Sequence, residues 1–127
     1  MARTDRRRAE RHGRLAEWLA ALYLTAKLYR ILARRFRTPF GEIDLVAQRG
    51  SRLVFAEVKV RGALDEAAQA ITPRGQRRIS SAARAWLMRH PGDATLAIRF
   101  DVIVMAPWRW PSHITGAFDD RGERPGP

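Results

Sequence analysis

The sequence predicts one α/β domain, built as a central mixed β-sheet flanked by helices in the order α-β-β-β-α-β. Three observations support this fold class. The chain has 127 residues, which is the size of a single domain with a real core. Two segments repeat their apolar residues with a helical period, and three strand-like segments lie between them. A long, strongly apolar segment after the second helix is typical of a central strand.

The charge of the chain indicates a polyanionic partner. Lysine and arginine number 24 against 13 aspartates and glutamates, which gives a net charge of +11. Such a balance favours nucleic acid first and an anionic membrane surface second. Nearly all of the positive charge is arginine, because Lys27 and Lys59 are the only lysines. Cysteine is absent, which excludes disulfides, thiolate nucleophiles and cysteine-bound zinc, and the three histidines lack metal-ligand spacing.

The sequence predicts a cytoplasmic protein without a membrane span. Its one long apolar stretch, 15–29, contains Glu17 and Lys27 and is shorter than the roughly 20 residues that a span needs. The basic start of the chain leads into a charged helix and not into the apolar core and cleavage site of a signal peptide.

The first elements are a basic terminus and a long helix. Residues 1–8 (MARTDRRR) are expected to form a flexible basic arm, or simply a disordered terminus, ahead of a single domain at 9–118. A helix is expected from Ala9 to about Tyr29, followed by an irregular basic strand at 30–37. The helix is apolar on two sides, so we expect both sides to be covered. One side carries Leu15, Trp18, Leu19, Leu22 and Ala26, and the other Ala20, Ala21, Leu24 and Leu28.

Two strand-like segments, 41–47 and 52–60, predict an antiparallel hairpin joined by the polar segment 48–51. With 48–51 as the loop, Ala47 faces Arg52 and Asp44 faces Phe55. Because side chains alternate along a strand, the two faces of the hairpin follow. One face is wholly apolar and belongs to the core: Ile43, Leu45, Ala47, Val54, Ala56, Val58 and Val60. The other carries Glu42, Asp44, Val46, Leu53, Phe55, Glu57 and Lys59.

The second half of the chain adds a helix and strands. After a loop with a short helix near 65–70, Thr72 is expected to cap a helix whose first residue is Pro73. The buried stripe of this helix consists of Ile79, Ala82, Ala83, Trp86 and Leu87. The run 95–106 is a strand, 113–118 is a candidate last strand, and 119–127 is expected to be a disordered tail.

The polar face of the hairpin gathers three carboxylates and a lysine at one end. Like charges on neighbouring strands repel one another unless something offsets them. Lys59 offsets one charge, and a divalent cation would offset the rest. Oxygen ligands select Mg²⁺ or Mn²⁺, which can polarise a phosphodiester and acidify a bound water. The competing interpretation is an exposed sheet face that carries surface salt bridges.

Two polar residues outside the hairpin are candidates for the same centre. Glu17 lies on the small-residue side of the first helix, which could bring its carboxylate to the metal, and a pair with Arg14 is the alternative. Gln76 lies in the buried stripe at the start of the second helix, where it could meet a phosphate or a metal-bound water. The alternative for Gln76 is a core glutamine that caps a backbone group.

Other features have a structural interpretation. Asp101, on the presumed central strand, is expected to pair with a nearby arginine, and a role as an extra acid is the alternative. Trp108-Arg109-Trp110 interleaves aromatic rings with a cation, as single-strand binders do, but packing on the sheet edge is the favoured interpretation. The histidines are expected to be surface or packing residues.

Several motifs together resemble the YraN-like family of bacterial proteins, within the PD-(D/E)XK nuclease superfamily that includes archaeal Holliday-junction resolvases. They are HGRLAEWLA (12–20), GEIDLVA (41–47), FAEVKVR (55–61), AITPRGQRRI (70–79), RFDVIV (99–104) and HITGAF (113–118). The resemblance implies a restriction-endonuclease-like fold with Asp44, Glu57 and Lys59 as its D…ExK set. It also implies Glu17 as the helix-borne acid and Gln76 as the polar residue of the second helix.

The sequence therefore predicts a metal-dependent endonuclease that hydrolyses phosphodiester bonds of DNA, branched or structured DNA included. The alternative is a nucleic-acid-binding module that keeps the nuclease fold with little or no catalysis. Branched-DNA resolvases act as symmetric dimers, so a homodimer is compatible with this prediction. Gly75 stands where the family usually has a lysine, which could weaken a phosphate contact. The arginines expected to contact nucleic acid are Arg35, Arg61, Arg74, Arg77 and Arg78.

Overall fold

The computed structural model describes the backbone of residues 3–60 and 72–118, and the side chains of these ranges from Gly13 onward. The elements are α1 (Arg3–Ala26), β1 (Arg30–Thr38), β2 (Gly41–Arg49), β3 (Arg52–Val60), α3 (Pro73–Arg89), a 3-10 turn η2 (Pro91–Thr95), β4 (Ala97–Met105) and β5 (Ser112–Phe118). The predicted order is confirmed, and so is the last strand. The expected short helix near 65–70, the tail 119–127 and Arg61 lie outside the described residues.

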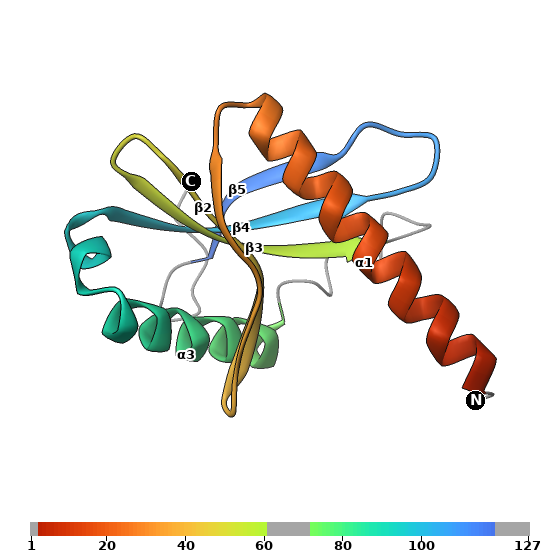
Figure 1. The fold of residues 1–127 in the computed structure, drawn as a ribbon, viewed down its shortest axis with the longest axis horizontal. Coiled ribbons are helices and arrows are strands. Elements are labelled where there is room, and N and C mark those ends of the chain that lie inside the picture. The colour runs from red at the N-terminus through yellow and green to blue at the C-terminus, as the bar shows by residue number, and fades with distance from the viewer. Residues whose placement is uncertain (1–2, 61–71, 119–127) are drawn as a thin grey trace.

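The strands form one mixed five-stranded sheet in the order β1-β2-β3-β4-β5. β1, β2 and β3 pair antiparallel as a meander, β3 and β4 pair parallel, and β4 and β5 pair antiparallel. A parallel pair needs a long crossover connection, and α3 lies in that connection. α1 and α3 cover opposite sides of the sheet (Figure 1). This arrangement is consistent with a restriction-endonuclease-like fold.

The core consists of two apolar clusters, one under each helix. The α3 side includes Val46, Phe55 and Trp86, and the α1 side includes Leu24 and Leu45. The hairpin faces are mostly as predicted, but Ile43 lies in the α3-side cluster and not with Leu45 and Ala47. Pairing between β2 and β3 ends at Leu45 and Ala56, so Ile43 belongs to a ribbon that pairs with β1 alone. Two-stranded ribbons twist more strongly, which turns this side chain to the other face.

The register of the β2–β3 hairpin differs from the predicted one by two residues. Arg49 pairs with Arg52, which leaves Gly50 and Ser51 as the loop, and Ala47 faces Val54 instead of Arg52. Gly50 adopts a φ of 59°, the left-handed conformation that a two-residue hairpin loop requires. Continuing this register places Asp44 opposite Glu57 and not opposite Phe55. Because the shift is an even number of residues, it does not change the predicted side-chain directions in the paired part of the hairpin, 45–49 and 52–56.

α1 begins at Arg3, so helical backbone extends into the segment 1–8, and it ends at Ala26 rather than near Tyr29. Leu28 adopts a φ of 72°, and the Tyr29 amide donates to the Leu24 carbonyl, as in a Schellman helix end. Among the residues that the structure describes, no helix combines the length and apolarity that crossing a bilayer requires.

The expectation that both apolar sides of α1 are covered is wrong for the described chain. The small-residue side packs on the sheet through Ala16, Ala20, Ala21 and Leu24, each at most 8% exposed. Small side chains let the helix approach the sheet closely, so the side that carries the larger apolar residues faces away from the sheet. Leu15, Trp18, Leu19 and Leu22 are 40–53% exposed. The prediction that the loop 108–110 packs on the sheet edge is also wrong, because the side chains of Trp108 and Trp110 are almost completely exposed to solvent.

α3 starts as the sequence predicts. Thr72 is the N-cap residue, its hydroxyl accepts a hydrogen bond from the Gly75 amide at 3.2 Å, and Pro73 occupies the first turn. The predicted stripe is buried at Ile79, Ala82, Ala83 and Trp86, with Leu87 partly buried. This helix therefore fixes Gln76, at its first turn, against the sheet.

Gly41, the first residue of β2, makes a close backbone contact that tests this packing. A Cβ atom at Gly41 would lie 2.0 Å from the Arg78 carbonyl oxygen in α3. We expect Gly41→Ala to lower the free energy of unfolding by ~1–3 kcal/mol, because a backbone neighbour can yield only if the helix shifts. The matched control is Gly13→Ala in α1, where nothing lies within 4 Å and alanine should stabilise the helix slightly. Urea unfolding measures both, and equal stabilities of G41A and the wild type would contradict the packing.

Candidate functional site

Asp44 lies where β2 and β3 separate. The last pair of this ladder is Leu45 with Ala56. Just beyond it, the Asp44 Oδ2 accepts a hydrogen bond from the Val58 amide at 2.8 Å. The carboxylate thus replaces the strand partner that the Val58 amide would otherwise have. This contact holds the Asp44 side chain beside the backbone of β3 at Val58, the residue between Glu57 and Lys59.

The surroundings of Asp44 disfavour its charged form. Burial is the main cause, and it raises the pKa of Asp44 to about 7 even though the bond from the Val58 amide acts in the opposite direction. The carboxylates of Glu17, Glu57 and Glu42 raise this pKa further. A carboxyl group in this setting is a strong candidate for a functional role, because a cation would remove most of the cost of its charge.

Glu57 and Lys59 lie on β3, on either side of Val58, and thus on the strand next to that of Asp44. The Lys59 Nζ lies 2.8 Å from the Glu57 Oε1, and their side chains are 28% and 18% exposed respectively. The other carboxylate oxygen, Glu57 Oε2, is buried and has no hydrogen-bond partner among the described residues. A buried carboxylate oxygen without a donor is costly, so this atom is suited to a ligand.

Glu17 reaches the same region from the small-residue side of α1. Its Oε2 accepts a hydrogen bond from the Arg35 Nε at 2.6 Å, so its partner is Arg35 and not the alternative, Arg14. Arg35, within β1, adopts a φ of 56°, a conformation that non-glycine residues seldom adopt. The hydrogen bond to Glu17 is the main cause that raises the pKa of Arg35, and the charges of Asp44 and Glu42 contribute.

The predicted residues of α3 fall into two groups. Gln76 is 3% exposed on the helix side that packs against β2. Arg74, Arg77 and Arg78 are exposed, and none has an ion-pair partner among the described residues. α3 therefore buries its glutamine and presents its guanidinium groups to solvent.

The donor set fits a magnesium-type ion better than a transition-metal ion. No group of three histidine, cysteine, aspartate or glutamate side chains among the described residues is arranged to hold a metal on its own. Mg²⁺ commonly takes one or two protein carboxylates and completes its shell with water and substrate phosphate. Asp44 and Glu57 supply two such groups, one with a raised pKa and one with a buried oxygen that lacks a donor.

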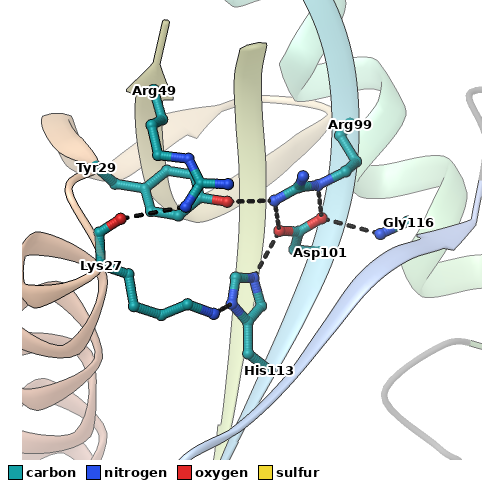
Figure 2. Close-up of polar contacts among 7 residues, drawn as sticks. All are labelled: Lys27, Tyr29, Arg49, Arg99, Asp101, His113 and Gly116. Carbon is teal, nitrogen blue, oxygen red and sulfur yellow. Dashed lines mark hydrogen bonds and ion pairs between the residues drawn. The ribbon is translucent and has the colours of Figure 1, made fainter.

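A second polar cluster, of which the sequence indicated only the pairing of Asp101 with an arginine, lies on the α1 side of the sheet (Figure 2). Asp101 is fully buried and accepts two hydrogen bonds from Arg99 at 2.8 Å, one from the Gly116 amide at 3.0 Å and one from the His113 Nε2 at 2.7 Å. The Lys27 Nζ lies 2.8 Å from the His113 Nδ1. The expected pairing of Asp101 with a nearby arginine is confirmed. The His113 side chain is buried, and its two ring nitrogens link Asp101 to Lys27.

The partners of this cluster fix its charges. Burial alone would raise the pKa of Asp101, but hydrogen bonds from His113, Arg99 and Gly116 hold it below its usual range. The Asp101 carboxylate can only accept and the Lys27 ammonium can only donate, so His113 carries its hydrogen on Nε2. The remaining contact of Arg99, with the Tyr29 hydroxyl at 2.6 Å, ties β4 to the start of β1. Because both Asp101 oxygens and the Tyr29 hydroxyl have hydrogen-bond partners, this cluster is a structural element of the fold.

Comparison with known proteins identifies the relatives of this chain. A UPF0102 protein of Rhodopseudomonas palustris (strain HaA2) is 57% identical over 115 residues, which cover 91% of this chain and 90% of the relative. One from Nitrobacter winogradskyi is 59% identical over 107 residues, covering 84% and 91%, and one from Mesorhizobium japonicum is 53% identical over 117 residues, covering 92% and 94%.

A family model described as "Uncharacterised protein family UPF0102" matches residues 16–105. This span contains all five predicted site residues, Glu17, Asp44, Glu57, Lys59 and Gln76. The chain therefore belongs to the UPF0102 family, the YraN-like proteins whose motifs its sequence carries.

Proposed function

We propose that this protein is a Mg²⁺- or Mn²⁺-dependent endonuclease that hydrolyses phosphodiester bonds of DNA, with branched or structured DNA among its substrates. The observation that carries the proposal is the proximity of two carboxylates whose oxygens are not fully compensated by protein groups. Asp44 is half-buried with its pKa raised to about 7, and the neighbouring Glu57 has a buried oxygen without a donor. The resemblance of Asp44, Glu57 and Lys59 to the D…ExK set of the PD-(D/E)XK nucleases supports the same conclusion.

Asp44 and Glu57 would hold the cation, which when bound supplies Lewis acidity and a more acidic water. The Val58 amide keeps the Asp44 carboxylate in place, so little reorganisation is needed on binding. Lys59, already 2.8 Å from Glu57, donates to the attacking water or to a phosphate oxygen on which negative charge develops. Gln76 would orient the same phosphate or water from the first turn of α3.

The charge of the surface supports DNA as the substrate. The net charge is +11, and the exposed arginines of α3 lack ion-pair partners among the described residues. Guanidinium groups bind phosphate oxygens in a bidentate manner, and each contact makes binding more salt-dependent. A protein that acts on chromosomal DNA in this way would work in the cytoplasm, and a homodimer would suit a substrate in which two strands are cut.

The test is cleavage of labelled linear, flapped and four-way-junction DNA in titrations of Mg²⁺ and Mn²⁺. We expect cleavage to require the cation and to fall by about 10²–10³-fold in Lys59→Met, which removes a donor aimed at developing charge. Arg52→Met is the matched control, because it removes one positive charge at the opposite, exposed end of β3. Equal loss in both variants would mean that only net charge matters, and cleavage that persists in EDTA would refute the metal dependence.

A second candidate is a nucleic-acid-binding module with this fold and no catalysis. It is favoured by the internal partners of the acids, because Glu17 is bound to Arg35 and Glu57 to Lys59. This candidate predicts that no DNA is cut with either cation, while salt-dependent binding persists in Asp44→Ala and Lys59→Ala.

A further inference from the structure

A hollow of about 450 Å³ opens between α1 and β1, beside the candidate site. It is lined by Arg14 and Glu17 from the helix and by Arg34 and Arg35 from the strand. Three guanidinium groups and one carboxylate therefore face the same space. The sequence places Arg14 near Glu17 and Arg34 beside Arg35, but only the fold brings the helix pair and the strand pair together, since the turn at 27–29 separates them.

The charges in this hollow are only partly balanced. Glu17 is bound to Arg35 at 2.6 Å, and these side chains are 14% and 29% exposed. Arg14 and Arg34 are exposed and have no hydrogen-bond or ion-pair partner among the described residues. Two positive charges thus remain, each with several N–H donors available. Planar guanidinium groups that converge in one concave space match the oxygen geometry of a phosphate group.

The hollow adjoins the carboxylates through residues that it shares with them. Glu17 lines the hollow and also acts electrostatically on Asp44, while Arg35 lines it and is influenced by the charge of Asp44. The Glu17–Arg35 pair is therefore the border between an acidic centre and a basic hollow. A nucleic-acid strand carries phosphates at regular intervals, so a strand with one phosphate at the carboxylates presents its next phosphates to a neighbouring basic surface.

We infer that the hollow lined by Arg14, Arg34 and Arg35 is a phosphate-binding subsite that holds the DNA backbone next to the bond to be cut. This inference rests on the proposed function and specifies the α1–β1 side as a path of the substrate strand. Glu17 acts there as a positioning residue, because its carboxylate fixes the Arg35 guanidinium at the edge of the hollow. Arg14 and Arg34 make the direct phosphate contacts.

The test is binding of a fluorescent DNA junction by the full chain in EDTA, where no cleavage can interfere. We expect Arg14→Gln/Arg34→Gln to weaken binding at least about tenfold and to reduce the salt slope by about one phosphate contact. The control is Arg30→Gln/Arg52→Gln, which removes the same charge from exposed positions at the far end of the sheet. An equal loss in the two double variants, or no loss in the first, would overturn the inference.

Chemically altered DNA locates the contact. Neutral methylphosphonate linkages are placed one at a time along the strand, and one linkage should weaken binding to the wild type but have no effect in Arg14→Gln/Arg34→Gln. Linkages that act alike in both proteins would contradict the subsite. Inorganic phosphate, titrated separately, tests a free anion as the true ligand. If it binds the wild type and not the double variant while DNA binding is the same in both, the hollow takes free phosphate and the inference is wrong.

The same measurements separate this inference from the proposed function. If Arg14 and Arg34 prove necessary for DNA binding but no cation supports cleavage, the subsite stands and the nuclease proposal fails. If metal-dependent cleavage and DNA binding both survive Arg14→Gln/Arg34→Gln unchanged, the nuclease proposal stands and the subsite fails.

Discussion

Replacing Asp44 with asparagine is expected to abolish metal-dependent cleavage and, at pH 8, to leave the fold at least as stable as the wild type. Loss of a group that only supports a metal ligand typically costs 10–100-fold, so we expect loss of a direct ligand to lower the cleavage rate by at least about 100-fold. The free energy of unfolding should not fall, because the variant no longer has to bury a carboxylate beside Glu17, Glu57 and Glu42. Asparagine keeps an oxygen that can accept the Val58 amide.

The pH dependence of this effect follows from the pKa of Asp44. In the folded chain the pKa is about 7, against 3.8 for the free side chain, so the folded state binds more protons between these values. The free energy of unfolding therefore falls as the pH rises from about 4 to 7, and the whole cost is present above pH 7. The difference between the two pKa values corresponds to about 4 kcal/mol at most.

Urea unfolding of the wild type and D44N in EDTA, from pH 5 to pH 8, measures this difference. The gap in stability should move in favour of D44N as the pH rises. Glu42→Gln serves as the control, because Glu42 lies two residues away on the same strand but is exposed and paired with Arg37 at 3.5 Å. If the curves of D44N and the wild type run parallel, the buried carboxylate is not a source of the pH dependence.

Asp101→Ala is expected to destabilise the fold by about 3–5 kcal/mol, because it removes one partner of a buried ion pair and leaves the others without an acceptor. Arg99, His113 and the Gly116 amide all donate to this carboxylate. Such a loss is a large fraction of the 5–15 kcal/mol that stabilises a typical domain. Thermal and urea unfolding measure it.

Asp101→Asn is the companion variant, since it keeps the size and one acceptor oxygen and should lose less. The lowered pKa of Asp101 adds a pH signature of the opposite sign to that of Asp44. Its contribution is complete above the usual pKa of an aspartate and is lost as the pH falls through the lowered value. If Asp101→Ala is as stable as the wild type, the cluster in Figure 2 is not a structural element.

Local patterns in the sequence predicted most of the fold. The cap at Thr72, the stripe around Ile79 and the alternation from Leu53 to Ala56 depend on residues close together in the chain, and each is confirmed. The loop of the β2–β3 hairpin was predicted two residues too long, because Gln48 and Arg49 are polar and yet continue the ladder. The buried side of α1 was not distinguished, because both sides are apolar and only contact with the sheet decides between them.

Contacts between distant residues account for the parts of the candidate site that the sequence did not predict. Glu17 was expected to serve the metal or to pair with Arg14, whereas its partner is Arg35 on a neighbouring strand. The link between Lys27 and His113 joins residues 86 positions apart. A signal was present at Asp101, since an acid two residues from Arg99 on an apolar strand needs several donors. The identity of those donors follows only from the topology.

The bond between the Asp44 carboxylate and the Val58 amide is an unusual link between β2 and β3 at the point where the two strands separate. Most of the hydrogen bonds between the strands join peptide groups, whose charge does not change with conditions. Here the join is a group that can gain a proton near neutrality, and the protonated form accepts a hydrogen bond less strongly. The distance between β2 and β3 at Asp44 is therefore coupled to the ionisation of the Asp44 side chain.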